Sequence, residues 1–235
     1  MRKFEKVLDV IFPKRCPVCD EVVGGIGKYV CDYCEKKLEY INEPYCLKCG
    51  RELKSINESI CESCRKYEHN FEYGRAVFVY NEELKESIYR FKYNNRPEYA
   101  YFYARKAVDR LGKWINEVHP DALISIPLHK SKLRNRGYNQ SFLFAREMGE
   151  LLKIPVYEHY LCRTEKTDIQ KTLDYEQRQN NLKKALKIDQ NVVKLSSVIL
   201  VDDICTTCST LDAAACVLKE AGVRTVYYIV LGIGE

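Results

Sequence analysis

The most regular chemical feature of the sequence is a set of cysteine pairs. Four C-x-x-C pairs begin at residues 16, 31, 46 and 61, so they repeat every 15 residues with 11 residues between pairs. Two cysteines in one tight turn can direct both sulfurs at one tetrahedral ion, and two such turns complete a zinc site with four cysteine ligands. The sequence therefore predicts two structural zinc ions. Their ligands are Cys16, Cys19, Cys31, Cys34, Cys46, Cys49, Cys61 and Cys64.

The spacing leaves the pairing of these cysteines open. Sequential pairing joins the first pair to the second and the third to the fourth, whereas a cross-braced arrangement joins the first to the third and the second to the fourth. In either case thiolates fill every position, so the predicted sites are structural rather than catalytic. A segment of about 55 residues with few large aliphatic side chains needs such metal sites in order to fold.

A fifth pair, Cys205 and Cys208, lies within the stretch LVDDICTTCSTL at residues 200–211. An apolar strand ends there in Asp202 and Asp203, and hydroxyl residues then surround the start of a helix. This pair could hold a metal, cycle between thiol and disulfide, or sit incidentally in an anion-binding turn. Free N–H groups, hydroxyls and the helix dipole favour an anion, and paired carboxylates suit sugar hydroxyls or a metal ion. The pattern fits a sugar phosphate that carries a second phosphate group.

The elements around this stretch alternate between strands and helices. Apolar runs predict strands, amphipathic runs predict helices, and this alternation is typical of a parallel sheet covered by helices on both faces. Strands are expected at 76–81, 122–128, 196–203 and 225–233, and helices at 83–94, 97–115, 138–153, 174–186 and 209–222. In such sheets ligands bind at the carboxyl ends of the strands. A polar loop at 129–140 follows one strand and carries four cations within residues 130–136, so it is either an anion-binding loop or a solvated surface.

Composition limits the remaining possibilities. The chain has 235 residues, 46% hydrophobic residues and a net charge of +5. We expect a Cys-rich domain at residues 1–70 and an α/β domain at 71–235. No apolar run approaches the roughly 18 residues that span a bilayer, and the first 16 residues lack the core of a signal peptide. A cytoplasmic protein with reduced thiols is expected.

Taken together, these motifs resemble the ComF family of competence-associated, amidophosphoribosyltransferase-like proteins. LVDDICTTCSTL is similar to the phosphoribosyl-pyrophosphate (PRPP) motif of type I phosphoribosyltransferases, and IPLHKSKLRNRGYNQSFLFARE and the four cysteine pairs also match the family. A further match is the pattern R-x-x-x-T-x-x-Q-x-x-L-x-x-x-x-R-x-x-N. Its residues are Arg163, Thr167, Gln170, Leu173, Arg178 and Asn181. The sequence departs from the family at Cys208, where glycine is usual.

The resemblance implies a type I phosphoribosyltransferase-like sheet behind a double zinc ribbon, and it implies PRPP and Mg²⁺ as ligands. Asp202 and Asp203 would hold the ribose hydroxyls. The 5′-phosphate would be held by Thr206, Thr207, Cys208, Ser209 and Thr210, and pyrophosphate and Mg²⁺ would face Lys130, Arg134 and Arg136. Residues 163–178 resemble a hood over the reacting centre. The implied catalytic residues are Asp202, Asp203, Arg163 and Lys166.

Three functions follow from this resemblance. The first is a PRPP-binding protein that supports the uptake or handling of single-stranded DNA in natural competence, together with a helicase or another DNA-processing partner. The second is a phosphoribosyltransferase of salvage or biosynthesis that acts on a small base or amine. The third is a zinc-ribbon interaction module without catalysis. Tyr89, Phe91 and Tyr93 alternate with cations and are either base-stacking residues or, at helical spacing, partly core residues.

Overall fold

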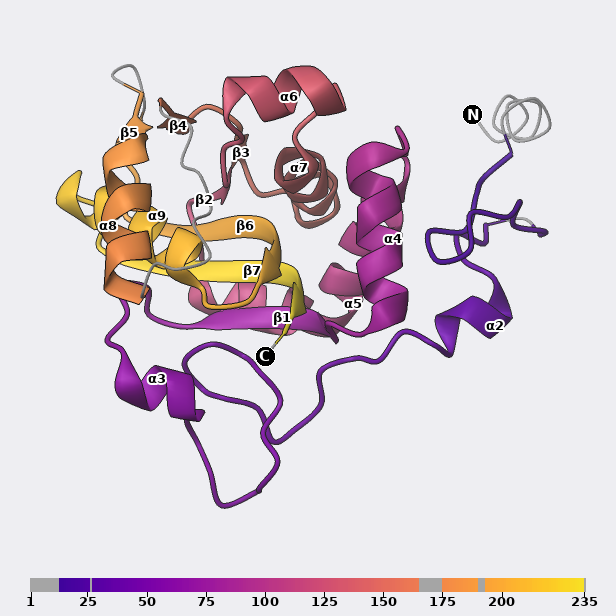
Figure 1. Ribbon diagram of the computed structural model, residues 1–235, viewed down its shortest axis with the longest axis horizontal. Coiled ribbons are helices and arrows are strands. Elements are labelled where there is room, and N and C mark those ends of the chain that lie inside the picture. The colour runs from indigo at the N-terminus through magenta and orange to yellow at the C-terminus, as the bar shows by residue number, and fades with distance from the viewer. Residues whose placement is uncertain (1–12, 26, 165–174, 190–192, 235) are drawn as a thin grey trace.

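The computed structural model describes residues 13–25, 27–164, 175–189 and 193–234 (Figure 1). Within these ranges the cysteine-rich part contains two short helices, α2 (Asp32–Glu35) and α3 (Glu62–Lys66). The larger part begins with β1 (Gly74–Val79), α4 (Glu82–Tyr93), α5 (Tyr99–Val118), β2 (Ala122–Ser125), α6 (Lys130–Arg136) and α7 (Gln140–Leu152). It continues with β3 (Val156–Tyr157), β4 (Leu161–Arg163), α8 (Tyr175–Ala185), β5 (Leu186–Ile188), β6 (Ser197–Cys205), α9 (Ser209–Glu220) and β7 (Thr225–Ile233).

Five strands form one sheet in the order β1-β7-β6-β2-β3, and every neighbouring pair is parallel. β6 lies in the centre, where a run of fully buried residues from Val198 to Val201 explains its continuous apolar sequence. β4 and β5 form a separate antiparallel pair. The predicted α/β class, a parallel sheet flanked by helices behind a Cys-rich module, is confirmed.

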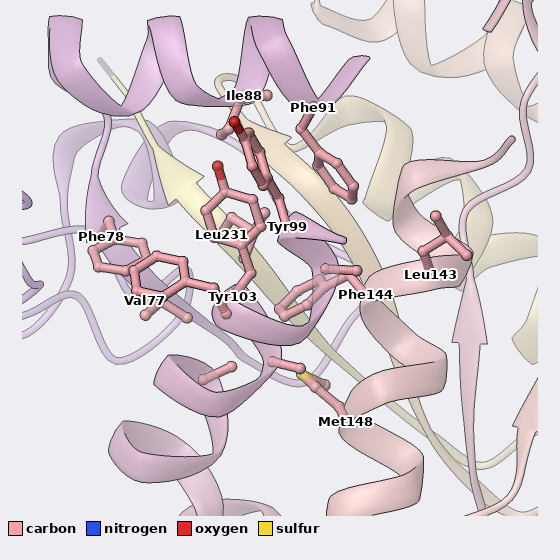
Figure 2. Close-up of a cluster of buried hydrophobic side chains, with 14 of the residues drawn as sticks. Val77, Phe78, Ile88, Phe91, Tyr99, Tyr103, Leu143, Phe144, Met148 and Leu231 are labelled. Carbon is pink, nitrogen blue, oxygen red and sulfur yellow. The ribbon is translucent and has the colours of Figure 1, made fainter. Parts of the chain in front are cut away.

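Two hydrophobic clusters cover the two faces of the sheet. Apolar side chains of α4, α5 and α7 pack with alternate strand residues such as Ile199 and Leu231 on one face. Figure 2 shows this cluster, in which Phe91, Tyr103 and Phe144 from these three helices gather beside the sheet. On the other face α9 packs against the intervening strand residues, which include Leu200 and Val230.

The cysteine-rich segment packs along β1, which is the edge strand. The backbone N–H of Val79 donates to the carbonyl of Glu39 at 2.8 Å, and that of Gly74 donates to Lys48 at 2.8 Å. In Figure 1, α3 lies below β1 and α2 lies to its right. The segment that carries the cysteines therefore covers the edge of the sheet that β1 would otherwise expose. The division into domains at residue 70 remains a proposal.

The predicted elements differ from the observed ones at one informative place. The sequence predicts a loop at residues 129–140, yet Lys130–Arg136 form α6. The imidazole Nδ1 of His129 accepts a hydrogen bond from the backbone N–H of Ser131 at 3.2 Å, and Gly137 ends the helix with φ 82°. This N-cap and the left-handed glycine supply the start and stop signals of a short helix.

None of the helices in the described ranges has the length and hydropathy needed to cross a membrane.

Candidate functional site

The eight N-terminal cysteines form two clusters with sequential pairing. One cluster joins Cys16, Cys19, Cys31 and Cys34, and the other joins Cys46, Cys49, Cys61 and Cys64, with all four sulfurs of each cluster within 4.8 Å of one another. The cross-braced alternative is therefore wrong. Zinc–sulfur bonds of about 2.3 Å in a tetrahedron place the sulfurs about 3.8 Å apart. The Cys19–Cys31 and Cys49–Cys61 sulfur distances are 3.8 and 3.7 Å, so both donor sets fit zinc.

The buried Cys46 sulfur shows how such a cluster favours thiolates. It accepts hydrogen bonds from the backbone N–H groups of Cys49 at 3.5 Å and Cys61 at 3.3 Å. Interactions with the thiols of Cys49 and Cys64, followed by these backbone donors, hold the pKa of the Cys46 thiol well below its usual range. Because zinc binds thiolates, the hydrogen bonds prepare this sulfur as a ligand.

The acidic pair lies at the carboxyl end of the central strand β6. Ser141 Oγ, on α7, donates to Asp202 Oδ1 at 2.8 Å, and the backbone N–H of Asp203 donates to the same oxygen at 2.9 Å. Asp203 instead forms an ion pair with Lys92 of α4, with a distance of 2.8 Å from Nζ to Oδ2. Burial, and then the neighbouring charge of Asp203, raise the pKa of Asp202 to about 7. The two carboxylates thus differ in environment although they are adjacent in sequence.

The turn after the acidic pair leads directly into α9. Cys208 is the N-cap residue, and it has φ 56° in the left-handed region. A cysteine costs on the order of 1 kcal/mol more than glycine in that conformation. The hydroxyls of Thr207 and Ser209 lie 3.0 Å apart, and a cavity of about 50 Å³ is lined by Asp202 and residues 204–211. A small cavity lined by hydroxyls at a helix N-terminus can hold an anion.

Cys205 and Cys208 are joined to each other in a disulfide, with a distance of 5.0 Å between their Cα atoms. The metal clusters found within the described residues are the two N-terminal ones, and this pair belongs to neither. Of the alternatives for this pair, metal binding therefore finds no support. The disulfide lies inside the predicted anion-binding turn.

Lys92 of α4 and Arg163 of β4 interact with the acidic pair, and two cations of α6 lie near these two side chains. Burial lowers the pKa of Lys132, and the charges of Arg163 and Arg136 lower it further. Lys92 also contributes to this effect. We call Lys92, Lys132, Arg136 and Arg163 the cation cluster. A lysine that is pushed toward neutrality by neighbouring cations is stabilised when an anion binds.

The predicted basic residues do not all take part in this arrangement. Arg136 belongs to the cation cluster, whereas Lys130 and Arg134 are exposed side chains of α6. Lys132, which is not among the basic residues predicted from the sequence, belongs to the cluster because it lies four residues before Arg136 on the same helical face. No sequence pattern indicates that Lys92 and Ser141 contact the acidic pair.

The hood residues are only partly covered by the structure. Arg163 lies at the end of β4, where burial lowers its pKa and the charge of Asp202 opposes that effect. The site residue Lys166 and the motif residues Thr167, Gln170 and Leu173 lie outside the described residues. The helix α8 includes the position of Arg178 and the exposed Asn181.

Comparison with known proteins agrees with this architecture. Residues 7–65 match the family model described as "Double zinc ribbon domain". The chain is 32% identical over 157 residues to "Competence protein F" of Haemophilus influenzae, covering 63% of this chain and 66% of that protein. It is 30% identical over 154 residues to "DNA utilization protein YhgH" of Salmonella typhi, covering 64% of this chain and 67% of that protein.

The chain belongs to the ComF family. A further ComF relative is "Competence protein ComFC" of Bacillus subtilis, which is 30% identical over 159 residues, with 63% of this chain and 58% of that protein covered. The match thus spans between 58% and 67% of the length of these three relatives. Among solved structures, a purine phosphoribosyltransferase from Pyrococcus horikoshii Ot3 is similar with a TM-score of 0.35 and 15% identity, covering 57% of this chain and 84% of that one. At this TM-score the similarity supports no conclusion about this chain.

Proposed function

We propose that this ComF protein binds PRPP together with Mg²⁺ at the carboxyl end of β6, and that it supports the handling of single-stranded DNA in the cytoplasm. The observation that carries the proposal is that the acidic pair adjoins the turn into α9 and interacts with Lys92 and Arg163 of the cation cluster. Names of relatives that refer to competence and to DNA utilization support the second half of the proposal.

Each part of PRPP has a matching group of residues in this proposal. Asp202 and Asp203 accept hydrogen bonds from the two ribose hydroxyls. The backbone and hydroxyl groups of residues 206–210 hold the 5′-phosphate, because an N-terminal helix dipole favours a phosphate there. Pyrophosphate lies against Lys132 and Arg136, and the flexible stems of the exposed Lys130 and Arg134 allow them to approach it.

The acidic pair also fits a magnesium ion, since Mg²⁺ is usually held by one or two carboxylates together with the phosphates of a substrate. Asp203 is the better placed ligand, because its carboxylate is balanced by a lysine rather than enclosed by hydrogen-bond donors. When bound, Mg²⁺ supplies positive charge that neutralises pyrophosphate as a leaving group. The chain's own residues hold the ribose and its phosphates in one orientation, with Arg163 and Lys166 as the proposed cations at the reacting centre.

Isothermal titration of the protein with PRPP and Mg²⁺ tests this half of the proposal. We expect saturable binding by the wild type and an affinity at least about tenfold weaker in Asp203→Asn, since a charged hydrogen-bond partner of ribose is lost. Asp109→Asn, which changes an exposed carboxylate on α5, is the matched control and should bind as the wild type does. Absence of heat with the wild type, or equal affinities of the three proteins, contradicts PRPP binding.

Single-stranded DNA has a candidate surface on α4, which adjoins the cation cluster at Arg136. Tyr89 and Tyr93 are 59% and 56% exposed and their ring centroids lie 4.9 Å apart, whereas Phe91 is fully buried in the core. Of the two alternatives for these aromatic residues, Phe91 is therefore a core residue, because its position on the helix faces inward. The guanidinium of Arg136 lies 4.8 Å from the centroid of the Tyr93 ring. Exposed aromatic rings beside cations suit stacked bases and phosphates.

Fluorescence anisotropy with a labelled oligonucleotide tests this surface. We expect binding that weakens steeply with salt, and a loss of about tenfold in affinity in Tyr93→Ala, because base stacking is worth about 1–3 kcal/mol. Tyr33→Ala is the matched control, since Tyr33 is 71% exposed beside Lys37 on the first zinc ribbon. A flat salt response removes phosphate contacts from the proposal. Loss of binding in Tyr33→Ala alone moves the DNA surface to the ribbon.

A turnover assay with a panel of bases and amines separates binding from transfer. Release of pyrophosphate with one of these nucleophiles supports the alternative of a salvage or biosynthetic transferase. PRPP binding without turnover favours a DNA-handling role with PRPP as a ligand. We further propose that a helicase or another DNA-processing protein of competence is the partner in that role.

A further inference from the structure

The second zinc ribbon, which comprises Cys46 to Cys64, contacts the turn between β6 and α9 directly. Arg51 Nη2 donates a hydrogen bond of 2.9 Å to the carbonyl oxygen of Thr206, across 155 residues of sequence. Arg51 is itself fixed to the ribbon, because its carbonyl accepts from the backbone N–H of the zinc ligand Cys46 at 2.7 Å. One end of the turn is therefore connected to a metal ligand through a single side chain.

The other end of the turn is connected to the same ribbon through Tyr228 of β7. The hydroxyl of this fully buried tyrosine donates to the carbonyl of the zinc ligand Cys49 at 2.8 Å, and it lies 3.3 Å from Cys208 Sγ. The ring fits there because Gly74 has no side chain: a Cβ at that position would lie 2.1 Å from Tyr228 Cζ. Both Thr206 and Cys208 thus have a link to the second ribbon.

The attachment of the ribbon to the sheet is equally close. Gly50, between Cys49 and Arg51, has φ 74°, and a Cβ there would lie 2.7 Å from the carbonyl oxygen of Gly74. Close approach of two backbones needs glycine at such a point. The backbone N–H of Gly74 also donates to the carbonyl of Lys48 at 2.8 Å. Arg51 therefore extends from a segment whose position relative to β1 is fixed.

The hydrogen bond from Arg51 has a consequence for the donors of the turn. In a planar trans peptide the C=O and N–H groups point in opposite directions. When Arg51 holds the carbonyl of Thr206, the N–H of Thr207 in the same peptide is directed away from the ribbon. A phosphate-binding turn depends on such fixed N–H directions, because donors that need no rearrangement bind an anion more strongly.

We propose that the second zinc ribbon positions the phosphate-binding turn, and that Arg51 is the positioning residue that orients the Thr206–Thr207 peptide. This inference rests on the proposed PRPP function for its ligand, but the effect on the turn does not depend on a ligand. The zinc ion of this ribbon holds the Cys46–Arg51 hairpin in place, and the Arg51 side chain then fixes the orientation of the Thr206–Thr207 peptide.

Hydrogen–deuterium exchange of the full chain tests the positioning directly. The variants are Arg51→Ala, Arg51→Lys and the control Arg65→Ala, which removes an exposed arginine that follows Cys64 on α3 and pairs with Glu58. Each protein is first shown to hold two zinc ions. In Arg51→Ala we expect the amide of Asp212, which donates to the carbonyl of Cys208 at the end of the turn, to exchange about tenfold faster, while those of the sheet stay unchanged. Arg51→Lys should restore part of the protection, and Arg65→Ala should match the wild type.

Titration with PRPP and Mg²⁺ is the second arm of the experiment. We expect an affinity about tenfold weaker in Arg51→Ala, as for the loss of one hydrogen bond to a charged group. If the wild type itself does not bind PRPP, the proposed function fails, and the exchange data still decide the positioning. If the Asp212 amide exchanges equally in Arg51→Ala and the wild type, or if exchange rises across the whole sheet, the positioning role is overturned.

Discussion

The two zinc ribbons share one cysteine spacing but contact different parts of the molecule. In the first ribbon, which comprises Cys16 to Cys34, Asp20 accepts hydrogen bonds from Arg96 and Tyr99, at the start of α5. Glu35, one residue after that ribbon, pairs with Lys106, also on α5. The second ribbon contacts Phe71, Tyr228 and the turn after β6. The first ribbon therefore supports the helical face of the core, whereas the second adjoins the candidate ligand site.

This difference arises from the residues between the cysteines. The position after the second cysteine of the ribbon is Asp20 in the first ribbon, and in the second ribbon it is Gly50, which is followed by Arg51. Asp20 has a positive φ of 63° and Gly50 one of 74°, so both turns have similar backbones. A common metal site thus presents an acid to α5 in one case and a guanidinium to a turn in the other.

The largest expected effect comes from removing one zinc ligand from each ribbon. Cys16→Ser and Cys46→Ser should each retain one zinc ion rather than two, and each should lose about 3 kcal/mol or more of unfolding free energy, because structural zinc contributes to folding. Only Cys46→Ser should also lose PRPP affinity by more than about tenfold, because the ribbon that it disrupts adjoins the turn. Metal analysis, denaturant unfolding and titration measure the three quantities. Equal losses of affinity in both variants would remove the functional distinction between the ribbons.

A smaller effect is expected from adding a methyl group at one glycine in each ribbon. Gly50→Ala should lower the free energy of unfolding by about 3 kcal/mol, because Gly50 has a positive φ and because the added Cβ would lie 2.7 Å from the carbonyl oxygen of Gly74. Gly27→Ala should cost only about 1 kcal/mol, because Gly27 also has a positive φ of 79° but no atom lies within 4 Å of the added Cβ. Urea denaturation at pH 7 measures both values. A cost at Gly50 no larger than that at Gly27 would show that the second ribbon is not tightly held against β1.

The smallest expected effect is a dependence of stability on pH that arises at Asp202 but not in the first ribbon. The pKa of Asp202 is raised to about 7, so its native state binds a proton that the unfolded state has released, and stability falls as pH rises toward and through 7. Between pH 6 and pH 8 the free energy of unfolding of the wild type should fall by about 1.4 kcal/mol relative to that of Asp202→Asn. This is the free energy that corresponds to one pKa unit.

The control for this pH effect is Asp20→Asn in the first ribbon. Burial tends to raise the pKa of Asp20, but the hydrogen bonds from Arg96 and Tyr99 outweigh it and lower the pKa below its usual value. Asp20 is therefore ionised at both pH 6 and pH 8, and its replacement should change stability equally at both. Urea denaturation of the three proteins at the two pH values makes the comparison. A difference between wild type and Asp202→Asn that does not change with pH contradicts the raised pKa.

Local spacing was sufficient to predict the zinc ligands, the strand that carries Asp202 and Asp203, and the helix that follows Cys208, although the strand continues to Cys205. Each of these rests on neighbours in sequence: a C-x-x-C turn, an apolar run or an N-terminal helix signal. The C-x-x-C at Cys205 also showed that a local motif can be ambiguous, since spacing alone fits metal binding, disulfide formation and an incidental position in the turn equally well.

Contacts between distant segments could not be predicted in this way. The hydrogen bond from Arg51 to Thr206 depends on how the ribbon packs along β1, and the ion pair from Lys92 to Asp203 depends on the packing of α4. The sequence does not distinguish Lys132 from its neighbours, because a loop at residues 130–136 defines no face. Once these residues form α6, the four-residue spacing of Lys132 and Arg136 places both on one face.

A crystal structure of the full chain with PRPP and Mg²⁺ tests the central claim most directly. The 5′-phosphate should lie against the backbone of residues 206–210, the ribose hydroxyls against Asp202 and Asp203, and pyrophosphate against Lys132 and Arg136. Arg51 should keep its hydrogen bond to Thr206 in that complex. Ordered PRPP bound elsewhere, or an empty turn at a concentration that saturates the protein in solution, would contradict the assignment of this turn as a ribose-phosphate site.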